Sequence, residues 1–235
     1  NAPAPRPRVP PTAAPMPGAP TAAPIIPPPA APPMAPMPAP FSRGVTAPPE
    51  ALARAFYDAD DALPRRHDLG DAGLEETVRL QCADTAEVLM PGRPEAARTV
   101  AEGFLADSRR MLRRNGPMLD RLRSRYRLGI VSNFYGNLEA VLASEGLRHL
   151  FGAVADSERV GAQKPDAALF RWALERLGTA PAETLMVGDS LRRDMAGAEA
   201  AGLPHAWLAG PKAGARPCCP GTPVLRSLLD LEALL

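Results

Sequence analysis

Short apolar runs that alternate with helical segments constrain the fold of this chain more than any other feature. After Gly116-Pro117 the sequence predicts, in order, helix 118–126, strand 128–131, helix 138–145, strand 151–154, helix 167–177, strand 185–187, helix 191–201, strand 205–208 and helix 224–234. Strands that are apolar throughout and separated by helices form a parallel sheet covered on both faces. We therefore expect an α/β core with a Rossmann-like parallel sheet over residues 116–235.

Residues 49–115 precede this core and are predicted to be helical throughout. The sequence Pro48-Pro49-Glu50 is a helix-start signal, because proline suits the first turn of a helix. Apolar residues then recur at helical spacing up to Pro64, at Leu52, Phe56, Ala59 and Leu63. Further helices are expected at 74–89 and 94–114, so we predict a separate helical domain over 49–115.

The first 48 residues are not expected to form a packed domain. Of the 30 prolines, 19 lie in residues 1–49, and proline breaks helices and central strands alike. Too few apolar side chains remain to offset the entropy of ordering, so we expect disorder or polyproline II structure over 1–48. The segment is interpreted either as non-native and dispensable, or as a genuine tail that recruits a partner with a proline-binding groove.

Composition argues against several classes of function. The chain has 27 Lys+Arg against 26 Asp+Glu, so no strongly basic surface for nucleic acid is implied. No apolar stretch approaches the roughly 20 residues that span a bilayer, so we expect no membrane partner. Three cysteines, of which Cys218 and Cys219 are adjacent, form no disulfide framework, which favours a reducing compartment. We expect a cytoplasmic protein.

Three polar motifs lie where the carboxyl ends of parallel strands place functional residues. They are Ser132-Asn133, the loop that holds Lys164, and Gly188-Asp189-Ser190 with Asp194. Ser132 and Asn133 can hydrogen-bond an oxyanion or phosphoryl group, and Lys164 would be a fixed cation. Asp189 and Asp194 place two carboxylates around the start of one helix, and Mg²⁺ prefers such oxygen ligands. Taken singly, the motifs can also be explained as helix caps, a surface lysine and a solvated charge.

Taken together, the motifs resemble the second, third and fourth sequence motifs of the haloacid dehalogenase-like (HAD) superfamily. The matching pieces are 128–133, Lys164-Pro165-Asp166, and Gly188-Asp189 through Asp194. The resemblance covers about 118–210, and the segment 49–115 is similar to the helical cap of the phosphoglycolate-phosphatase-like branch. It implies a hydrolase, and most simply an Mg²⁺-dependent phosphatase of a small phosphorylated metabolite.

The resemblance also implies a role for each matching residue. Ser132 would bind the transferring phosphoryl group with Asn133 beside it, and Lys164 would offset negative charge in the transition state. Asp189 would ligate Mg²⁺, and Asp194 would either assist the metal or orient Lys164. The Gly-Asp-Ser motif followed by Asp194 is similar to that of the Mg²⁺-dependent phosphatases, whereas the metal-free dehalogenases usually carry an Asn-containing motif there.

The superfamily's first motif, an apolar strand followed by a nucleophilic aspartate, has no counterpart in residues 1–48, which contain no aspartate. Asp58 and Asp60 resemble a nucleophile and its acid/base partner superficially, but Arg54 would then enter a sheet. Helical spacing explains the same segment, so we interpret both as an acidic helix face. The resemblance therefore implies a core without its central first strand, between the strands ending at Ser132 and Gly188. We expect two strand edges roughly 9–10 Å apart, low stability and no turnover.

Two other functions stay open beside that of an inactive phosphatase. A pseudoenzyme or partner-binding protein could use the proline-rich head to recruit its partner. A haloacid dehalogenase would release chloride without a metal. Retention of the second, third and fourth motifs favours descent from an active phosphatase, and whether this chain is an enzyme depends on the missing nucleophile.

Overall fold

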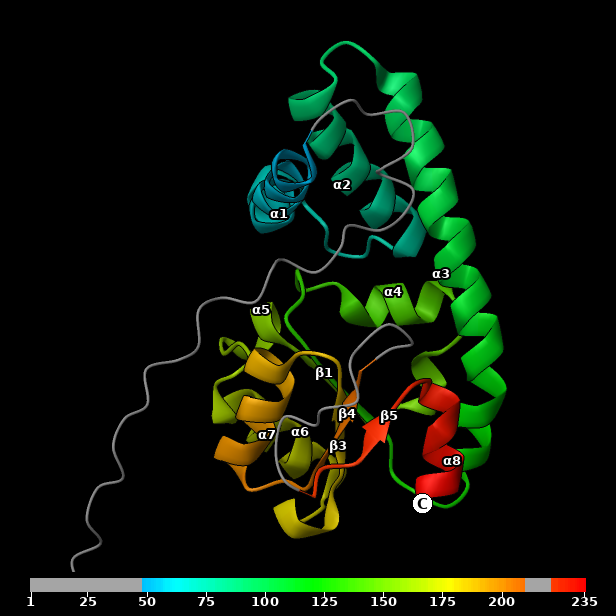
Figure 1. Cartoon of the computed structure of the whole chain (residues 1–235), viewed down its shortest axis with the longest axis vertical. Coiled ribbons are helices and arrows are strands. Elements are labelled where there is room, and N and C mark those ends of the chain that lie inside the picture. Colours follow the sequence, from blue (N-terminus) through cyan, green and yellow to red (C-terminus); the bar gives the residue numbers. More distant parts are fainter. Residues whose placement is uncertain (1–47, 210–220) are drawn as a thin grey trace, which may run out of the picture. The chain divides into compact units, whose positions relative to one another are not determined.

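The computed structural model describes residues 48–209 and 221–235, and its first elements are helices (Figure 1). These are α1 (Pro49–Arg66), α2 (Leu74–Leu89) and α3 (Pro94–Arg123). The prediction of a helical segment is confirmed, and α2 has the predicted bounds. The predicted disordered segment, apart from Pro48, and the Cys218–Cys219 pair lie outside the described residues.

Two helices continue past the prolines at which they were predicted to end. α1 includes Pro64, and α3 includes Pro117 and most of the segment predicted as a separate helix. A proline inside a helix costs about 3 kcal/mol. In α3 the two side chains that follow, Met118 and Leu122, are only 1% and 4% exposed, and burying such side chains stabilises by about 1.5–3 kcal/mol each. Packing against the core therefore outweighs the local cost of Pro117.

The three helices share an apolar core of their own. Its buried members are Val78 and Cys82 of α2 with Val100, Ala101 and Leu105 of α3. The side chains of α1 that were predicted to face inward do so, since Leu52, Ala59 and Leu63 are buried and Phe56 packs against this core. Burial raises the pKa of the Cys82 thiol to about 12, so this cysteine behaves as a small apolar residue.

Strands and helices alternate from residue 129 onward. In chain order the elements are β1 (Gly129–Ser132), α4 (Leu138–Ser144), β2 (Ala153–Asp156), α5 (Ser157–Val160), α6 (Ala167–Leu177), β3 (Met186–Gly188), a π-helical turn (Leu191–Met195), α7 (Ala196–Ala201), β4 (His205–Leu208), β5 (Val224–Leu225) and α8 (Leu231–Leu234). The predicted order of strands and helices is confirmed up to β4. The helix predicted over 224–234 is wrong in its first part, because residues 224–225 form β5.

All strand pairs in the described residues are parallel, but they form two sheets. β1 pairs with β2 in the register Gly129↔Ala153 to Ser132↔Asp156. β3, β4 and β5 form the second sheet in that order. In the described part of the chain β1 and β3 each keep one edge without a strand partner, so the parallel strands do not form one continuous sheet.

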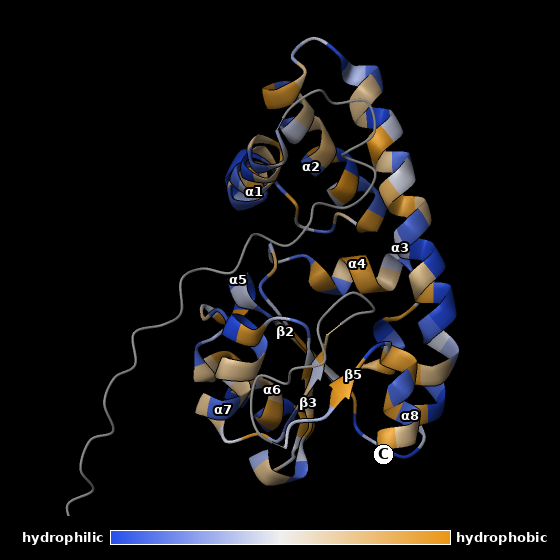
Figure 2. Ribbon diagram, viewed as in Figure 1, coloured by the Kyte–Doolittle hydropathy of each residue, from blue (hydrophilic) through white to orange (hydrophobic). Residues whose placement is uncertain are grey.

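Helices cover both faces of these strands. Phe170 of α6 and Ala198 of α7 belong to an apolar cluster that includes Val131 of β1 and Met186 of β3. Val187, the next residue of β3, points to the opposite face because side chains alternate along a strand, and it packs against a cluster from α3 and α8. Apolar side chains therefore pack against both faces. Figure 2 colours β3 and β5 as hydrophobic.

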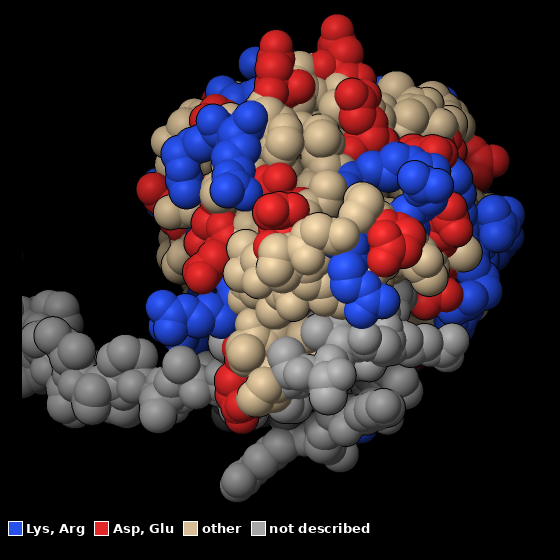
Figure 3. Space-filling model, turned by 90° about the horizontal axis from the view of Figure 1, so that it is seen from above, with Lys and Arg blue, Asp and Glu red and all other residues tan. Residues whose placement is uncertain are grey.

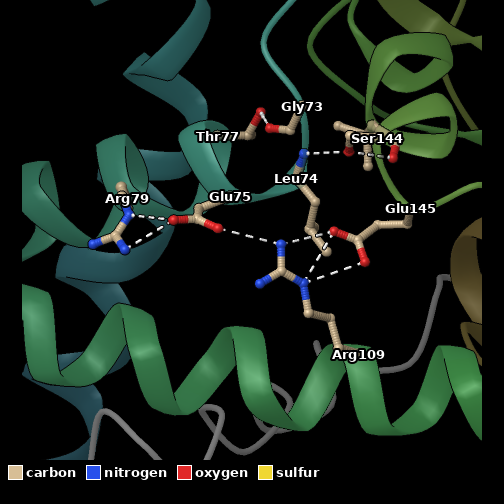
Figure 4. A network of polar contacts seen from close by, with 9 residues as sticks. Gly73, Leu74, Glu75, Thr77, Arg79, Arg109, Ser144 and Glu145 are labelled. Carbon is tan, nitrogen blue, oxygen red and sulfur yellow. Dashed lines mark hydrogen bonds and ion pairs between the residues drawn. The ribbon is translucent and has the colours of Figure 1, made fainter.

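A polar network joins the helical segment to α4 (Figure 4). Arg109 of α3 donates to Glu145, which follows α4, at 3.0 Å and to Glu75 of α2 at 3.3 Å. The backbone N–H of Leu74 donates to Ser144 Oγ at 3.0 Å. At the other end of α4, the buried side chain of Asn137 donates to the Ala72 carbonyl and to Thr77 Oγ1, at 2.8 Å each. These contacts hold α2 beside the segment that leaves the carboxyl end of β1.

Charged groups of both signs intermix on the face of the protein that Figure 3 shows. This agrees with the nearly equal numbers of basic and acidic residues in the sequence. None of the helices in the described ranges combines the length and the apolar character that a membrane span requires.

Candidate active site

A largely buried ion pair lies at the carboxyl ends of β1 and β3. Lys164 Nζ donates to Asp194 Oδ1 at 2.7 Å, and the two side chains are only 14% and 5% exposed. Lys164 belongs to the loop before α6, and Asp194 to the π-helical turn after β3. The alternative explanation of Lys164 as a surface lysine, and of Asp194 as a solvated charge, is wrong. The structure therefore brings together two of the predicted site residues.

Asn133 fixes the loop that carries the lysine. Its Oδ1 accepts a hydrogen bond from the backbone N–H of Lys164 at 2.7 Å, and its Nδ2 donates to the Lys164 carbonyl at 3.2 Å. A single side chain thus satisfies both backbone groups of one residue. Asn133 directly follows β1, so this strand sets the position of Lys164. The structure indicates a positioning role for Asn133, because its amide is engaged by the loop.

The position of Asp194 depends on a close backbone approach at the end of β3. Its Oδ2 accepts a hydrogen bond from the backbone N–H of Ser190 at 2.9 Å. A Cβ atom added to Gly188 would lie 2.5 Å from the Asp194 side chain, so only glycine fits at this position. The turn begins with Ser190, whose Oγ accepts from the Arg193 N–H, so Ser190 and not Asp189 caps it.

Ser132 and Asp189 end their strands without bonding directly to the ion pair. The hydroxyl of Ser132 makes one contact in the described residues, at 3.5 Å to the Asn133 carbonyl. The Asp189 carboxylate is exposed and has no partner in the described part of the chain, whereas its backbone carbonyl accepts from Trp207 Nε1 at 3.0 Å. Both side chains are therefore available to a ligand.

The carboxylate oxygens of the site meet part of what Mg²⁺ requires of its ligands. Within the described ranges, no three His, Cys, Asp or Glu side chains lie close enough together to hold a metal ion. Lys164 and Ser190 already occupy both oxygens of Asp194, which leaves Asp189 as the free carboxylate of the site. Because Mg²⁺ keeps several waters and often takes one or two carboxylates with substrate phosphate, a site built on Asp189 fits it when a phosphate is bound.

Asp58 and Asp60 both lie on α1, as the helical interpretation predicts. Asp58 is exposed. Asp60 is not part of a solvated face, because its carboxylate accepts hydrogen bonds from the Tyr135 hydroxyl and from Gln81 Nε2. Tyr135 follows Asn133 by two residues, so Asp60 is held against the loop that leaves β1. No feature of the sequence indicated this contact, which joins segments 75 residues apart.

Burial is the largest influence on the pKa of the Asp60 carboxylate. It raises the pKa of Asp60, although the hydrogen bond from Tyr135 and the positive charge of Arg193 both lower that pKa. Burial and the charge of Asp60 together raise the pKa of the Tyr135 hydroxyl. Arg193, which precedes Asp194 in the π-helical turn, therefore lies within electrostatic reach of Asp60.

One structural carboxylate was missed by the sequence reasoning. Asp156, the last residue of β2, is only 1% exposed and accepts hydrogen bonds from the backbone N–H groups of Gly136, Leu138 and Glu158 at 2.9–3.1 Å. It therefore fixes the loop between Tyr135 and α4. An aspartate directly after an apolar strand was the signal that could have found it, as it was for Asp189.

Comparison with known proteins identifies the family. The sequence model of the haloacid dehalogenase-like hydrolases matches residues 50–202, more than half of the chain. The chain belongs to the haloacid dehalogenase-like hydrolase family. A solved dehalogenase structure superposes with a TM-score of 0.55 at 20% identity and covers 81% of this chain and 86% of its own, which supports the fold alone.

Phosphatases are among the curated relatives. A phosphoserine phosphatase of Thermus thermophilus is 39% identical over 121 residues, which are 50% of this chain and 49% of that protein. A glyceraldehyde 3-phosphate phosphatase of Methanothermobacter thermautotrophicus is 38% identical over 79 residues, 33% of this chain and 35% of that protein. The chain thus spans half or less of the length of these relatives.

Proposed function

We propose that the site around Lys164 is the phosphoryl-binding site of a HAD-like phosphatase that takes a small phosphorylated metabolite together with Mg²⁺. The observation that carries this proposal is the held lysine, an ammonium group fixed by Asp194 and by Asn133 between the ends of β1 and β3. Two relatives that are phosphatases of small metabolites support the class of substrate.

The chemistry of the site follows from its free donors. An ammonium group has three N–H donors, and Asp194 takes one of them, so two remain for phosphoryl oxygens. Asp194 and Asn133 hold the lysine in place before a ligand binds. The lysine therefore need not move when negative charge develops on the phosphoryl group, and no free energy is lost to reorganisation. The hydroxyl of Ser132, at the end of β1, is a further donor. Asp194 acts as the positioning residue of Lys164, the second of its two predicted roles.

Mg²⁺ would bind through the Asp189 carboxylate and, when present, would neutralise charge on the bound phosphate. Asp189 is the suitable ligand because its carboxylate is exposed and free in the described residues, whereas Asp194 is engaged by Lys164 and Ser190. The helical segment 49–115, the predicted cap of the phosphoglycolate-phosphatase-like branch, would contribute Asp60 near the substrate. Tyr135, in the loop that leaves β1, is the partner that holds this carboxylate.

The described carboxylates near the site do not offer an evident nucleophile. Asp60 is bound by Tyr135 and Gln81, Asp194 is bound by Lys164, and Asp189 is the proposed metal ligand. We therefore propose that this chain lacks the first motif with its strand, and that it binds phosphate without turning over a phosphate ester. Within residues 48–209 and 221–235, β1 and β3 each keep an edge without a strand partner, which supports the absence of that strand.

Binding of inorganic phosphate, measured by isothermal titration calorimetry with and without Mg²⁺, tests the proposal. We expect binding that Mg²⁺ strengthens in the wild type. Lys164→Met removes the binding under both conditions, and Asp189→Asn removes only the effect of Mg²⁺. Glu199→Gln, an exposed carboxylate on α7, is the matched control and leaves binding unchanged. Equal phosphate affinity in Lys164→Met and wild type contradicts the proposal.

A further inference from the structure

Arg193 is a charged residue beside the candidate site to which the proposed function gives no role. It belongs to the π-helical turn after β3 and directly precedes Asp194, the partner of Lys164. The residue is exposed, and its guanidinium group makes no hydrogen bond or ion pair within residues 48–209 and 221–235. A guanidinium group has five N–H donors, so those of Arg193 are available to a ligand.

The backbone of the turn fixes where this side chain begins. The Arg193 N–H donates to Ser190 Oγ at 3.2 Å, and the Asp194 N–H donates to the Ser190 carbonyl at 2.8 Å. The next side chain along the turn, that of Asp194, is buried against Lys164. Consecutive Cα atoms are about 3.8 Å apart, so Arg193 begins close to the ion pair. A small metabolite bound to Lys164 by its phosphate can therefore reach Arg193 with a second group.

The surroundings of Asp60 indicate the direction in which the guanidinium group extends. Its positive charge lowers the pKa of Asp60, so it lies within electrostatic reach of that carboxylate on α1. The Tyr135 hydroxyl and Gln81 Nε2 already donate to Asp60. In the described part of the chain Arg193 forms no ion pair with it. The guanidinium group therefore extends toward α1 with its donors unused.

The shape of a guanidinium group favours a planar anion as its ligand. Its fork of N–H donors matches the two oxygens of a carboxylate, and such a pair forms two parallel hydrogen bonds. The ammonium group of Lys164 is a point charge, and its remaining donors suit phosphoryl oxygens. The site thus offers two cationic contacts of different geometry, one for a phosphate and one for a carboxylate.

We propose that Arg193 determines the specificity of this site by binding the carboxylate of a phosphorylated metabolite whose phosphoryl group is held by Lys164. The inference rests on the proposed function and narrows its substrate class to phosphate esters of small carboxylic acids. Tyr135 and Gln81 contribute to the same selection. Because they engage Asp60, this carboxylate competes less with the ligand for the guanidinium group.

Two ligands that differ in one group test this proposal. Glycerate 3-phosphate and racemic glycerol phosphate have the same carbon chain, and a carboxylate in the first stands where the second has a hydroxymethyl group. Isothermal titration calorimetry of the full chain gives both dissociation constants, with and without Mg²⁺. We expect wild type to bind glycerate 3-phosphate about tenfold or more tightly, because hydrogen bonds between charged groups are stronger than those to a hydroxyl.

Three variants assign this preference to one side chain. Arg193→Gln removes the charge, and Arg192→Gln is the matched control, because Arg192 is exposed in the same turn but points in another direction. We expect a preference of about twofold or less in Arg193→Gln and the wild-type preference in Arg192→Gln. Arg193→Lys keeps the charge without the fork and should restore only part of the preference. A ratio of two affinities in one protein is not changed by a general loss of stability.

Each outcome decides the proposal. Loss of the preference in Arg193→Gln alone supports it. Equal affinity of wild type for the two ligands, an unchanged preference in Arg193→Gln, or an equal loss in Arg192→Gln overturns it while the proposed function stands. If wild type binds neither ligand, or if Lys164→Met binds inorganic phosphate as tightly as wild type does, the proposed function fails and this inference fails with it.

Discussion

The Lys164–Asp194 pair is expected to couple the two sheets energetically, and a double-mutant cycle measures this coupling. Lys164→Met keeps most of the aliphatic side chain and removes the charge. Asp194→Asn keeps an oxygen for the Ser190 N–H group and removes the opposite charge. Each single change leaves the other charge buried and unpaired, which costs about 3–5 kcal/mol of unfolding free energy.

The size of the coupling follows from the geometry. At the 2.7 Å separation of the two atoms, an effective dielectric constant of about 20 gives a Coulomb attraction of about 6 kcal/mol. Desolvation of two ions offsets much of this attraction. We expect a net coupling of about 1.5–3 kcal/mol, the range for a hydrogen bond to a charged group. The double variant is therefore less destabilised than the sum of the single variants.

Urea unfolding followed by circular dichroism and tryptophan fluorescence gives the four free energies, with coincident transitions as the test of two-state behaviour. Arg121 and Glu232 form an exposed pair at 2.8 Å and are the matched control, for which no resolvable coupling is expected. Additive effects of Lys164→Met and Asp194→Asn would refute the view that this pair holds the carboxyl ends of β1 and β3 together.

Two further predictions follow from the same region. Gly188→Ala places a Cβ atom 2.5 Å from Asp194, so it should destabilise the protein by about 1–3 kcal/mol in urea unfolding and weaken phosphate binding; unchanged stability would show that the turn adapts. Because burial raises the pKa of Asp60 above its ordinary value of 3.8, the folded state holds this proton more tightly. The unfolding free energy should therefore fall as pH rises from about 3.8 through the folded pKa, and Asp60→Asn should gain stability relative to wild type over that interval. If the difference in unfolding free energy between Asp60→Asn and wild type stayed constant across this pH interval, the prediction would be wrong.

Local signals in the sequence predicted much of the fold. The helix at 167–177 is bounded by Asp166, whose side chain caps its first turn, and by Gly178 in the left-handed conformation at its end. Apolar runs between helices predicted β1, β3 and β4 to within one residue. These elements were predictable because capping and hydrophobic periodicity depend on neighbouring residues alone.

The errors arose where distant contacts decide the structure. Pro117 is a helix breaker by local rules, but burial of Met118 and Leu122 against the core keeps α3 continuous. Residues 224–225 form β5 because β4 lies beside them, with Trp207 N–H donating to the Pro223 carbonyl. The residues around Pro117 and 224–225 do not by themselves predict that α3 packs on a core or that β4 offers an open edge.

The sequence predicted which residues belong to the candidate site, but it did not predict the hydrogen bonds between them. The positions of Lys164 and Asp194 after strands indicated a common site, and the structure joins them. The two bonds from Asn133 to the Lys164 backbone and the contact between Asp60 and Tyr135 could not be predicted. They depend on loop geometry and on how α1 packs, which no spacing in the sequence specifies.

Phosphate release tests most directly the central claim that the site binds phosphate but has no nucleophile. Phosphoserine and glyceraldehyde 3-phosphate are incubated with Mg²⁺ and either wild type or Asp189→Asn, after phosphate binding has shown that the wild-type site is intact. The account predicts no release above the blank from either protein. Mg²⁺-dependent release by the wild type that Asp189→Asn abolishes would contradict it, and would place a working nucleophile in this chain.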